Sequence, residues 1–525
     1  MQQKPSLSQI EILIRPELFD HLIYPIGTKL DDNNIILLFR KLHVLSEIDF
    51  KISLQEWKLR AVEFGLTETE ANVLFQTYKV FDSDNNNEFT SNSANSRYEG
   101  NNSKNSVDVR FFGLFFALQA FSQRTKISLN IDRGDKSPFN YHLSNPLSSP
   151  RGKTSNSSRG QTPGLEHQFI VNFVKSNLKL FLRIIASDIH NTETSLNASE
   201  FNTLKFLFKI YDPNNTTNQS IQSYSSNKKN PNQLCNYADF FENVSPVSKV
   251  NMNIANEWLL SVISNDPPSD YFKIKNLSKS VSTTSECTNE SILITQCDDS
   301  HFFINTNVAN CKISHCTNCT IVIAAVNKII SIDKCVKCKI CVVTNFIRIS
   351  NTIDSNIYFY SVNEPILFGD NRGICLGPHN VTYSELYTHI KNSKLMLLKQ
   401  GLNNFANPIV LNSKNNEQTS IIQPINFTTI TVPFEAKDPL YFKLTPKPYI
   451  EVIEKKLNNY LSIKSMIKDI GLTEDQEKNL HICLQGYFRE WLANTGTYKE
   501  MDDIVKMIDN NLPKINEDHT KEESD

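Results

Sequence analysis

The sequence predicts a mixed architecture, with an N-terminal all-α domain, a central right-handed parallel β-helix and a C-terminal α/β extension. Three observations predict it. Apolar residues recur at helical spacing in the first half, β-branched residues and cysteine dominate the middle, and a short motif repeats at a regular interval there. These changes place the domains at residues 1–270, 273–390 and 391–515, followed by a charged, disordered tail at 516–525.

The composition excludes several classes of protein. The 525 residues include 54 basic and 56 acidic side chains, for a net charge of −2. This balance gives no general attraction to nucleic acid or to anionic lipid, so we predict no nucleic-acid partner. The first residues lack the pattern of a secretory signal. The longest apolar stretches, such as 111–118, are far shorter than the roughly 20 residues of a membrane span, so we predict none.

The N-terminal half is predicted to be helical, with polar inserts. Helical periodicity covers 8–82, 107–130 and 165–212, with a short helix around 258–263. Thr67 to Glu70 form a capping-box pattern, and an aromatic stripe that includes Phe75, Tyr78 and Phe81 follows it as the predicted core face. Nothing in this half has catalytic spacing. The Asn/Ser-rich inserts predicted to be disordered are 83–106, 132–163 and 213–235.

The central segment contains a repeat. Its copies begin at Ile294, Ile313, Ile332, Ile349 and, in degraded form, Leu367. The number of residues from the start of one copy to the start of the next suits one coil of a three-sided solenoid. Three strands of about five residues and the corners between them use that length. Stacked coils place equivalent residues in inward columns. The predicted columns are Ile294-Ile313-Ile332-Ile349-Leu367, Phe302-Ile321-Ile340-Ile357-Cys375 and Ile304-Ile323-Val342-Phe359.

Paired cysteines accompany this repeat. Cys316, Cys319, Cys335 and Cys338 have the spacing of a four-cysteine zinc site. The same two positions hold Cys297 and Ser300 in the coil before, and Thr352 and Ser355 in the coil after. Small residues that fit a corner explain every member of the two columns, whereas zinc explains only four. We therefore predict a packing role and no metal or other cofactor, with a zinc site as the alternative.

The number of cysteines in the chain indicates the cellular compartment. The chain has 11 cysteines, an odd number, of which eight lie between Cys297 and Cys375. Such a set is expected to consist of free thiols in a reducing compartment, where buried cysteine acts as a small apolar residue. We therefore predict a cytoplasmic protein.

The C-terminal part is predicted to contain helix and strand pieces that pack on the end of the solenoid, at 395–402, 424–432 and 441–444. Thr473 to Gln476 form a second capping box. It opens a helix that carries Leu480, Leu484, Tyr487, Phe488 and Trp491. We predict that Gly496 ends this helix and that Trp491 is docked in a core.

The repeat resembles the C-CAP/cofactor C-like domain of the tubulin-binding cofactor C family. The resemblance lies in 316–323, in 349–352 and in 369–383, which contains Gly369-Asp-Asn-Arg-Gly-Ile-Cys-Leu-Gly-Pro378. Flanking stretches, among them 56–82 and 488–496, are similar to one subgroup of the family. The resemblance implies a parallel β-helix and a role in the cytoskeleton.

The family's enzymatic members stimulate GTP hydrolysis with an arginine finger in a Gln-X-Arg motif. Such an arginine accelerates hydrolysis by roughly 10³–10⁵. Here Arg348 falls at the finger position, but Phe346 replaces the glutamine. We predict that Arg348 is a solvated charge on the outer wall, with the finger role as the alternative. Lys328, one coil earlier, lacks the planar guanidinium fork.

The resemblance implies a non-enzymatic cytoskeletal scaffold at the microtubule-organising centre, which positions the centrosome, basal body or spindle pole and the Golgi. The expected location is the cytoplasm and cytoskeleton, at the centrosome and spindle pole, and the expected partners are proteins of the centrosome and microtubule system, with tubulin or a small GTPase as candidates. The alternative is a GTPase-activating protein or folding cofactor for tubulin or an Arf-like GTPase. With only 15 glycines, no phosphate-cradling loop stands out.

Overall fold

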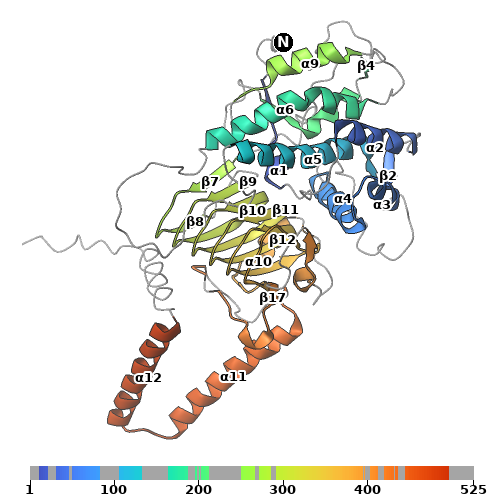
Figure 1. The fold of residues 1–525 in the computed structure, drawn as a ribbon. Helices are drawn as coiled ribbons and strands as arrows, with labels where there is room; N and C mark the ends of the chain where they lie inside the picture. The colour runs from blue at the N-terminus through green and yellow to red at the C-terminus, as the bar shows by residue number, and fades with distance from the viewer. Residues whose placement is uncertain are drawn as a thin grey trace, which may run out of the picture.

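The computed structural model describes residues 11–21, 31–45, 50–82, 106–132, 163–186, 195–197, 200–201, 203–211, 250–265, 271–284, 291–393, 395, 403–411, 419–430, 432–434 and 444–495. Apart from a few end residues, the three polar inserts lie outside these ranges, as do Gly496 and the tail. The described ranges form an N-terminal helical region, a central parallel β-solenoid and C-terminal helices (Figure 1). This architecture confirms the predicted fold class.

The N-terminal region is built from helices with three small antiparallel strand pairs, which the sequence analysis did not anticipate. The helix predicted over 165–212 ends at Ile185 in the structure, and a short 3₁₀ turn and strands follow it. The helices are α1 (Glu17–Asp20), α2 (Asp32–Leu45), α3 (Leu54–Glu63), α4 (Glu68–Asp82), α5 (Val109–Asp132), α6 (Pro163–Ile185), η3 (Thr203–Phe206) and α9 (Met252–Val262). The pairs are β1 (Glu11–Ile14) with β5 (Phe208–Tyr211), β2 (Lys51–Ser53) with β3 (Ser106–Asp108), and β4 (Ser195–Leu196) with β6 (Val250–Asn251).

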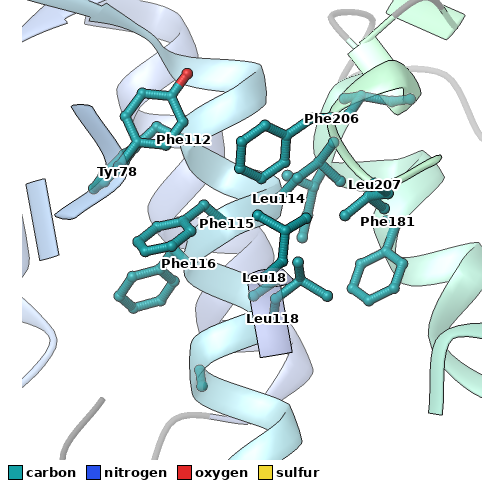
Figure 2. Close-up of a cluster of buried hydrophobic side chains, with 14 of the residues drawn as sticks. Leu18, Tyr78, Phe112, Leu114, Phe115, Phe116, Leu118, Phe181, Phe206 and Leu207 are labelled. Atoms are coloured by element: carbon teal, nitrogen blue, oxygen red, sulfur yellow. The ribbon is translucent and has the colours of Figure 1, made fainter. Parts of the chain in front are cut away.

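Aromatic side chains from several helices make one core in this region. Figure 2 shows Tyr78 of α4 beside Phe112 and Phe115 of α5. The ring of Phe112 lies 4.7 Å from that of Trp57 and 5.4 Å from that of Tyr78. The predicted capping box is present, because the Glu70 carboxylate accepts from the Thr67 N–H at 2.7 Å. The aromatic stripe of α4 is therefore a core face, as predicted.

The solenoid consists of parallel strands that pair with their counterparts one coil away. The last two strands lie beyond residue 390, so the segment assigned to the C-terminal extension completes the final coil. The strands are β7 (Tyr271–Lys275), β8 (Val281–Thr284), β9 (Ser291–Thr295), β10 (His301–Ser314), β11 (Thr320–Asp333), β12 (Lys339–Ser350), β13 (Asn356–Ser361), β14 (Ile366–Phe368), β15 (Ile374–Pro378), β16 (Ile409–Leu411) and β17 (Thr419–Ile421).

Each central coil has three walls. The pairing of β10 with β11 shifts register between Ile304 and Asn307 and again between Val308 and Asn310, which divides the long strand into three segments. We call the wall that contains 310–314 and its counterparts wall A, the wall that contains 301–304 wall B, and the short wall that contains 307–308 wall C. Walls A and B meet at a corner that contains the cysteine pairs. The predicted three-sided coil is therefore present.

The inward columns follow the prediction with one exception. Ile294, Ile313, Ile332, Ile349 and Leu367 pair in register on wall A. On wall B, however, Ile357 pairs with Leu376 and not with Cys375. The prediction was wrong by one residue, because the last corner is one residue longer: Leu367 pairs with Ile349, but Arg372 bridges to Ile353.

The corner between walls A and B depends on left-handed backbone. Two residues in each coil have positive φ, such as Asn318 at 51° and Lys337 at 53°. This conformation directs the N–H of Asn318 to the carbonyl of Val336 in the next coil, at 2.8 Å. Residues other than glycine adopt a backbone with positive φ at some cost in energy. The hydrogen bonds between coils therefore hold the corner in this conformation. The non-glycine residues concerned are Asn276, Lys279, Gln296, Asp299, His315, Asn318, Lys334, Lys337, Asn351 and Asp354.

The C-terminal part comprises α10 (Leu386–Asn392), the 3₁₀ turns η6 (Asn404–Ala406) and η8 (Pro424–Asn426), α11 (Lys447–Asp469) and α12 (Glu474–Thr495). The capping box that opens α12 is present, with the N–H of Thr473 donating to the Gln476 side chain at 3.0 Å. The prediction that Trp491 is docked was wrong, because its side chain is 47% exposed. Among the described residues, no helix is long and apolar enough to cross a membrane.

Candidate functional site: the wall that carries Arg348

Arg348 lies on β12, on the outward side of wall A. Its neighbours in the adjacent coils are Ser331 on β11 and Ile366 on β14. Lys312 pairs with Ser331 one coil further on. The sequence therefore placed Arg348 on the correct side of the strand. The residue aligned with it in the preceding coil is Ser331, not Lys328.

The helical region packs directly on this outward side. Phe346, Ile329 and Ile366 are buried in the same hydrophobic core as α4 and α5. Phe368 and Leu411, one column away, belong to that core as well. Helix α4 packs against β11 and β12. Because wall A is covered on both sides, its strands lose the alternation of buried and exposed residues that a solvated wall would have.

Arg348 is consequently buried. Its side chain is 8% exposed, and its guanidinium carbon lies 5.4 Å from the ring centroid of Phe368. Its Nε has no hydrogen-bond partner among the described residues. Burial lowers the pKa of Arg348, and the charge of Asp333 in the next column partly opposes that shift. The prediction of a solvated charge was wrong, because the helical region covers the wall on which Arg348 stands.

Asp333 provides a negative charge close to this arginine. Burial alone would raise the pKa of its carboxyl group, but Lys334, Arg348 and two hydrogen bonds hold that pKa below its usual range. Those bonds come from Ser350 at 2.7 Å and Asn351 at 3.0 Å. The carboxylate therefore stays ionised in the interface and compensates part of the buried positive charge.

Phe346 is an apolar contact between wall A and the helical region. It occupies the position of the finger motif's glutamine, and only 3% of it is exposed. A glutamine there would place an amide in an apolar contact with the helical region and leave it without partners. The phenylalanine instead anchors that region to the solenoid. Sequence reasoning missed this role, although the apolar residues Ile329, Ile366 and Phe368 at outward positions were a signal for it.

His21 ties the helical region to the same wall through a polar contact. Its Nδ1 lies 2.6 Å from the hydroxyl oxygen of Ser331, directly beside Arg348. Burial lowers the pKa of His21 well below its usual value, Lys312 and Arg348 lower it further, and Glu17 opposes them. The imidazole is therefore neutral where it meets the wall.

This neutral histidine predicts that stability falls in mild acid. The unfolded chain binds a proton at His21 near pH 6.5, whereas the folded chain does not, so stability is complete above that pH and declines below it. His43 and His379 also have lowered pKa values and add to the decline. His21→Asn should reduce the dependence of the free energy of unfolding on pH by the contribution of one proton, up to about 1.4 kcal/mol per pH unit. Urea unfolding measured from pH 7 down to pH 5 checks this, and equal slopes for the two proteins would contradict it.

Wall B is covered by the C-terminal segment. Phe303, Cys341 and Tyr358 form a buried outward column there. The ring of Phe303 lies 6.3 Å from Phe434, and that of Tyr358 lies 6.3 Å from Phe427. In the central coils, neither of the two long walls therefore presents its outward column to solvent.

The cysteine pairs lie in the corner between these walls. Each cysteine makes the same kind of hydrogen bond as the serines and the threonine that occupy its column in other coils. Each side chain donates to the carbonyl two residues before it. The bonds are Cys297 to Thr295, Cys316 to Ser314, Cys335 to Asp333 and Thr352 to Ser350 in one column, and Ser300 to Asp298, Cys319 to Thr317, Cys338 to Val336 and Ser355 to Ile353 in the other. The geometry supports packing, since one small donor replaces another.

In the part of the chain that the structure describes, no group of three or more histidine, cysteine or acidic side chains is arranged to hold a metal ion. We predict that Cys316→Ser/Cys335→Ser lowers the free energy of unfolding by less than about 3 kcal/mol, because serine keeps the bond to the carbonyl. Loss of a structural zinc would cost about 10 kcal/mol or more. Thermal unfolding and metal analysis of the purified chain check this. Stoichiometric zinc that the double variant loses would contradict it.

The corner between the two long walls carries exposed residues in the central coils. Its exposed positions include His315, Thr317, Asn318, Lys337 and Asp354. We call this set the corner ridge. The residues are polar and of mixed charge, and bonds between coils, such as that from the Asn318 amide to Asp299, align them.

Comparisons with known proteins agree with this geometry. Residues 271–407 match the family model described as "Tubulin binding cofactor C". The chain is 25% identical over 218 residues to a protein of Xenopus tropicalis named "TBCC domain-containing protein 1". It is 23% identical over 219 residues to the Homo sapiens protein of that name and 22% over 218 residues to that of Gallus gallus. Each match covers 41% of this chain and 39% of the relative, so the chain matches well under half of these relatives' length.

Proposed function

We propose that this chain, whose residues 271–407 match the family model described as "Tubulin binding cofactor C", is a non-enzymatic cytoskeletal scaffold. Its proposed site of action is the microtubule-organising centre, where it contributes to positioning the centrosome, basal body or spindle pole and the Golgi. The proposed location is accordingly the cytoplasm, at the centrosome and spindle pole. Its partners would be proteins of the microtubule system, including tubulin.

The proposal rests on the burial of wall A beneath the helical region. An arginine finger acts by placing its guanidinium against the phosphate of a bound nucleotide, so it must be accessible to a partner protein. Arg348 is covered by the helical region, and Phe346 fills the neighbouring position of the motif with an apolar anchor. Catalysis by this arginine would require the helical region to leave the wall, which exposes a large aromatic surface. A rigid binding surface requires no such opening.

The corner ridge is the surface that the solenoid offers to partners. It runs across the coils, and its positions are fixed by the bonds between them. The ridge displays both signs of charge at a regular spacing close to that of parallel strands, about 4.8 Å. Such a surface suits a protein partner with a matching row of polar groups better than it suits a small molecule.

Imaging the tagged full-length chain against a γ-tubulin marker tests the proposal. We expect enrichment at γ-tubulin foci for the unmodified chain and its loss for Thr317→Glu/Lys337→Glu, which adds negative charge to the corner ridge. Leu59→Glu, on the exposed side of α3, is a control away from the corner ridge and should keep the enrichment. A chain that spreads evenly through the cell with no enrichment at these foci would contradict the proposed location.

A further inference from the structure

The C-terminal hairpin, made of α11, the turn at 470–473 and α12, contacts the solenoid through the first turns of α11. The hydroxyl of Tyr449 donates to the carbonyl of Ile422 at 2.7 Å, and its ring lies 5.1 Å from that of Phe427. Lys456 donates to the carbonyl of Ile425 at 2.9 Å. Beyond that point α11 runs away from the solenoid, and α12 turns back from its far end (Figure 1).

This hairpin carries a concentration of exposed apolar side chains. More than half of the large hydrophobic side chains that are exposed among those described lie on it. Scattered exposed apolar residues are ordinary, but a concentration of this kind marks an interaction surface. The side chains on the hairpin are those of Leu457, Tyr460, Leu461, Ile463, Met466, Ile470, Ile482, Leu484, Tyr487, Phe488 and Trp491.

Their spacing is that of a helix-packing face. On α12, Leu480, Leu484, Tyr487 and Phe488 recur at positions i, i+4, i+7 and i+8. This pattern places them along one side of the helix, as at the seam of a coiled coil. The side chain of Leu484 is 53% exposed and that of Tyr487 is 72% exposed, so α11 of the same chain does not cover this seam.

The two helices have opposite charge. Helix α11 has five lysines and three carboxylates, whereas α12 has four carboxylates and two basic residues. The lysines Lys464 and Lys468 lie toward the end of α11, and Glu474 and Glu477 lie in the first turn of α12. If α11 of one chain packs antiparallel to α12 of another, these groups meet. Each then also lies at the helix end whose dipole favours its charge.

We propose that the hairpin is a self-association element that pairs two copies of this chain, with α11 of each copy packed antiparallel against α12 of the other. The four helices then bury the apolar seams and bring the basic end of α11 against the acidic start of α12. A second copy supplies both complementary faces at once. The end of the hairpin that contains the turn at 470–473 lies away from the solenoid, where a second copy can approach it (Figure 1).

The mass of the full chain in solution tests self-association. Light scattering with size exclusion at micromolar concentration, under reducing conditions so that the exposed Cys483 cannot cross-link, should give twice the chain mass of 60.0 kDa. Leu484→Glu/Tyr487→Glu should give the mass of one chain. Asn479→Glu/Ala493→Glu adds the same charge on the opposite side of α12 and should remain a dimer. A monomeric unmodified chain would overturn the proposal, and so would a Leu484→Glu/Tyr487→Glu variant that stays dimeric.

A charge exchange tests the proposed pairing of the helices. Lys464→Glu/Lys468→Glu reverses α11, and Glu474→Lys/Glu477→Lys reverses α12. Each variant alone should dimerise at least about tenfold more weakly, because like charges meet at both contacts. An equimolar mixture should form a heterodimer with affinity near that of the unmodified chain, because opposite charges then meet at both contacts. A mixture that dimerises no better than its components would overturn the α11-to-α12 arrangement.

Discussion

Phe346→Ala is expected to lower the free energy of unfolding by about 3–5 kcal/mol, the cost of truncating a fully buried phenylalanine. The side chain is packed between wall A and the helical region, where Ile329 and Ile366 are its neighbours in the shared core. Its removal leaves a cavity at the contact that joins the two parts of the molecule. Urea unfolding followed by circular dichroism measures the change.

Leu59→Ala is the control for this prediction. Leu59 also lies in the structured part of the chain, but 67% of it is exposed, so its truncation should change stability by less than about 0.5 kcal/mol. If Phe346→Ala costs no more than the control, the helical region does not rest on wall A, and the burial of Arg348 loses its basis.

Ile332→Asp is expected to prevent the solenoid from folding. Ile332 is completely buried in the inward column of wall A, between Ile313 and Ile349 of the adjacent coils. A carboxylate there would be a charge without a partner in an apolar interior, at a cost of about 4–5 kcal/mol or more. The neighbouring coils lose their contacts with the substituted coil as well, because a solenoid is stabilised through nearest neighbours.

Circular dichroism of the purified Ile332→Asp chain should show loss of strand signal and of the cooperative transition. Lys337→Asp adds the same side chain to an exposed position of the corner ridge in the same coil, and it should fold normally. A folded Ile332→Asp chain with an unfolding midpoint near that of the control would show that the side chain of residue 332 does not point into the solenoid.

The sequence predicted the solenoid because its repeat is a direct consequence of stacking. Ile294, Ile313 and Ile332 are aligned in the chain for the same reason that they are aligned in space: each must cover its neighbour. The prediction fails only in the column of wall B, at Cys375, where the corner that begins at Gly369 has an added residue and Leu376 takes the inward place. A degenerate copy of the repeat does not show where such an insertion lies, because its residues no longer match the motif.

What covers the solenoid could not be predicted in the same way. Whether an outward residue such as Arg348 is solvated depends on segments far away in the sequence, among them α1 and α4. The periodicity of a strand identifies its two sides but not the partner of the outer one. Trp491 illustrates the converse, since the spacing of α12 identified an apolar face but not that this tryptophan is 47% exposed.

The most direct test of the central claim is a single-turnover measurement of GTP hydrolysis by tubulin, with cofactors D and E and either this chain, its Arg348→Ala variant or cofactor C. With Arg348 covered and Phe346 in place of the motif's glutamine, the chain and its variant should leave the rate at the level without them, while cofactor C accelerates it. Acceleration by the chain that Arg348→Ala abolishes would contradict the account, because the guanidinium would then have reached the nucleotide.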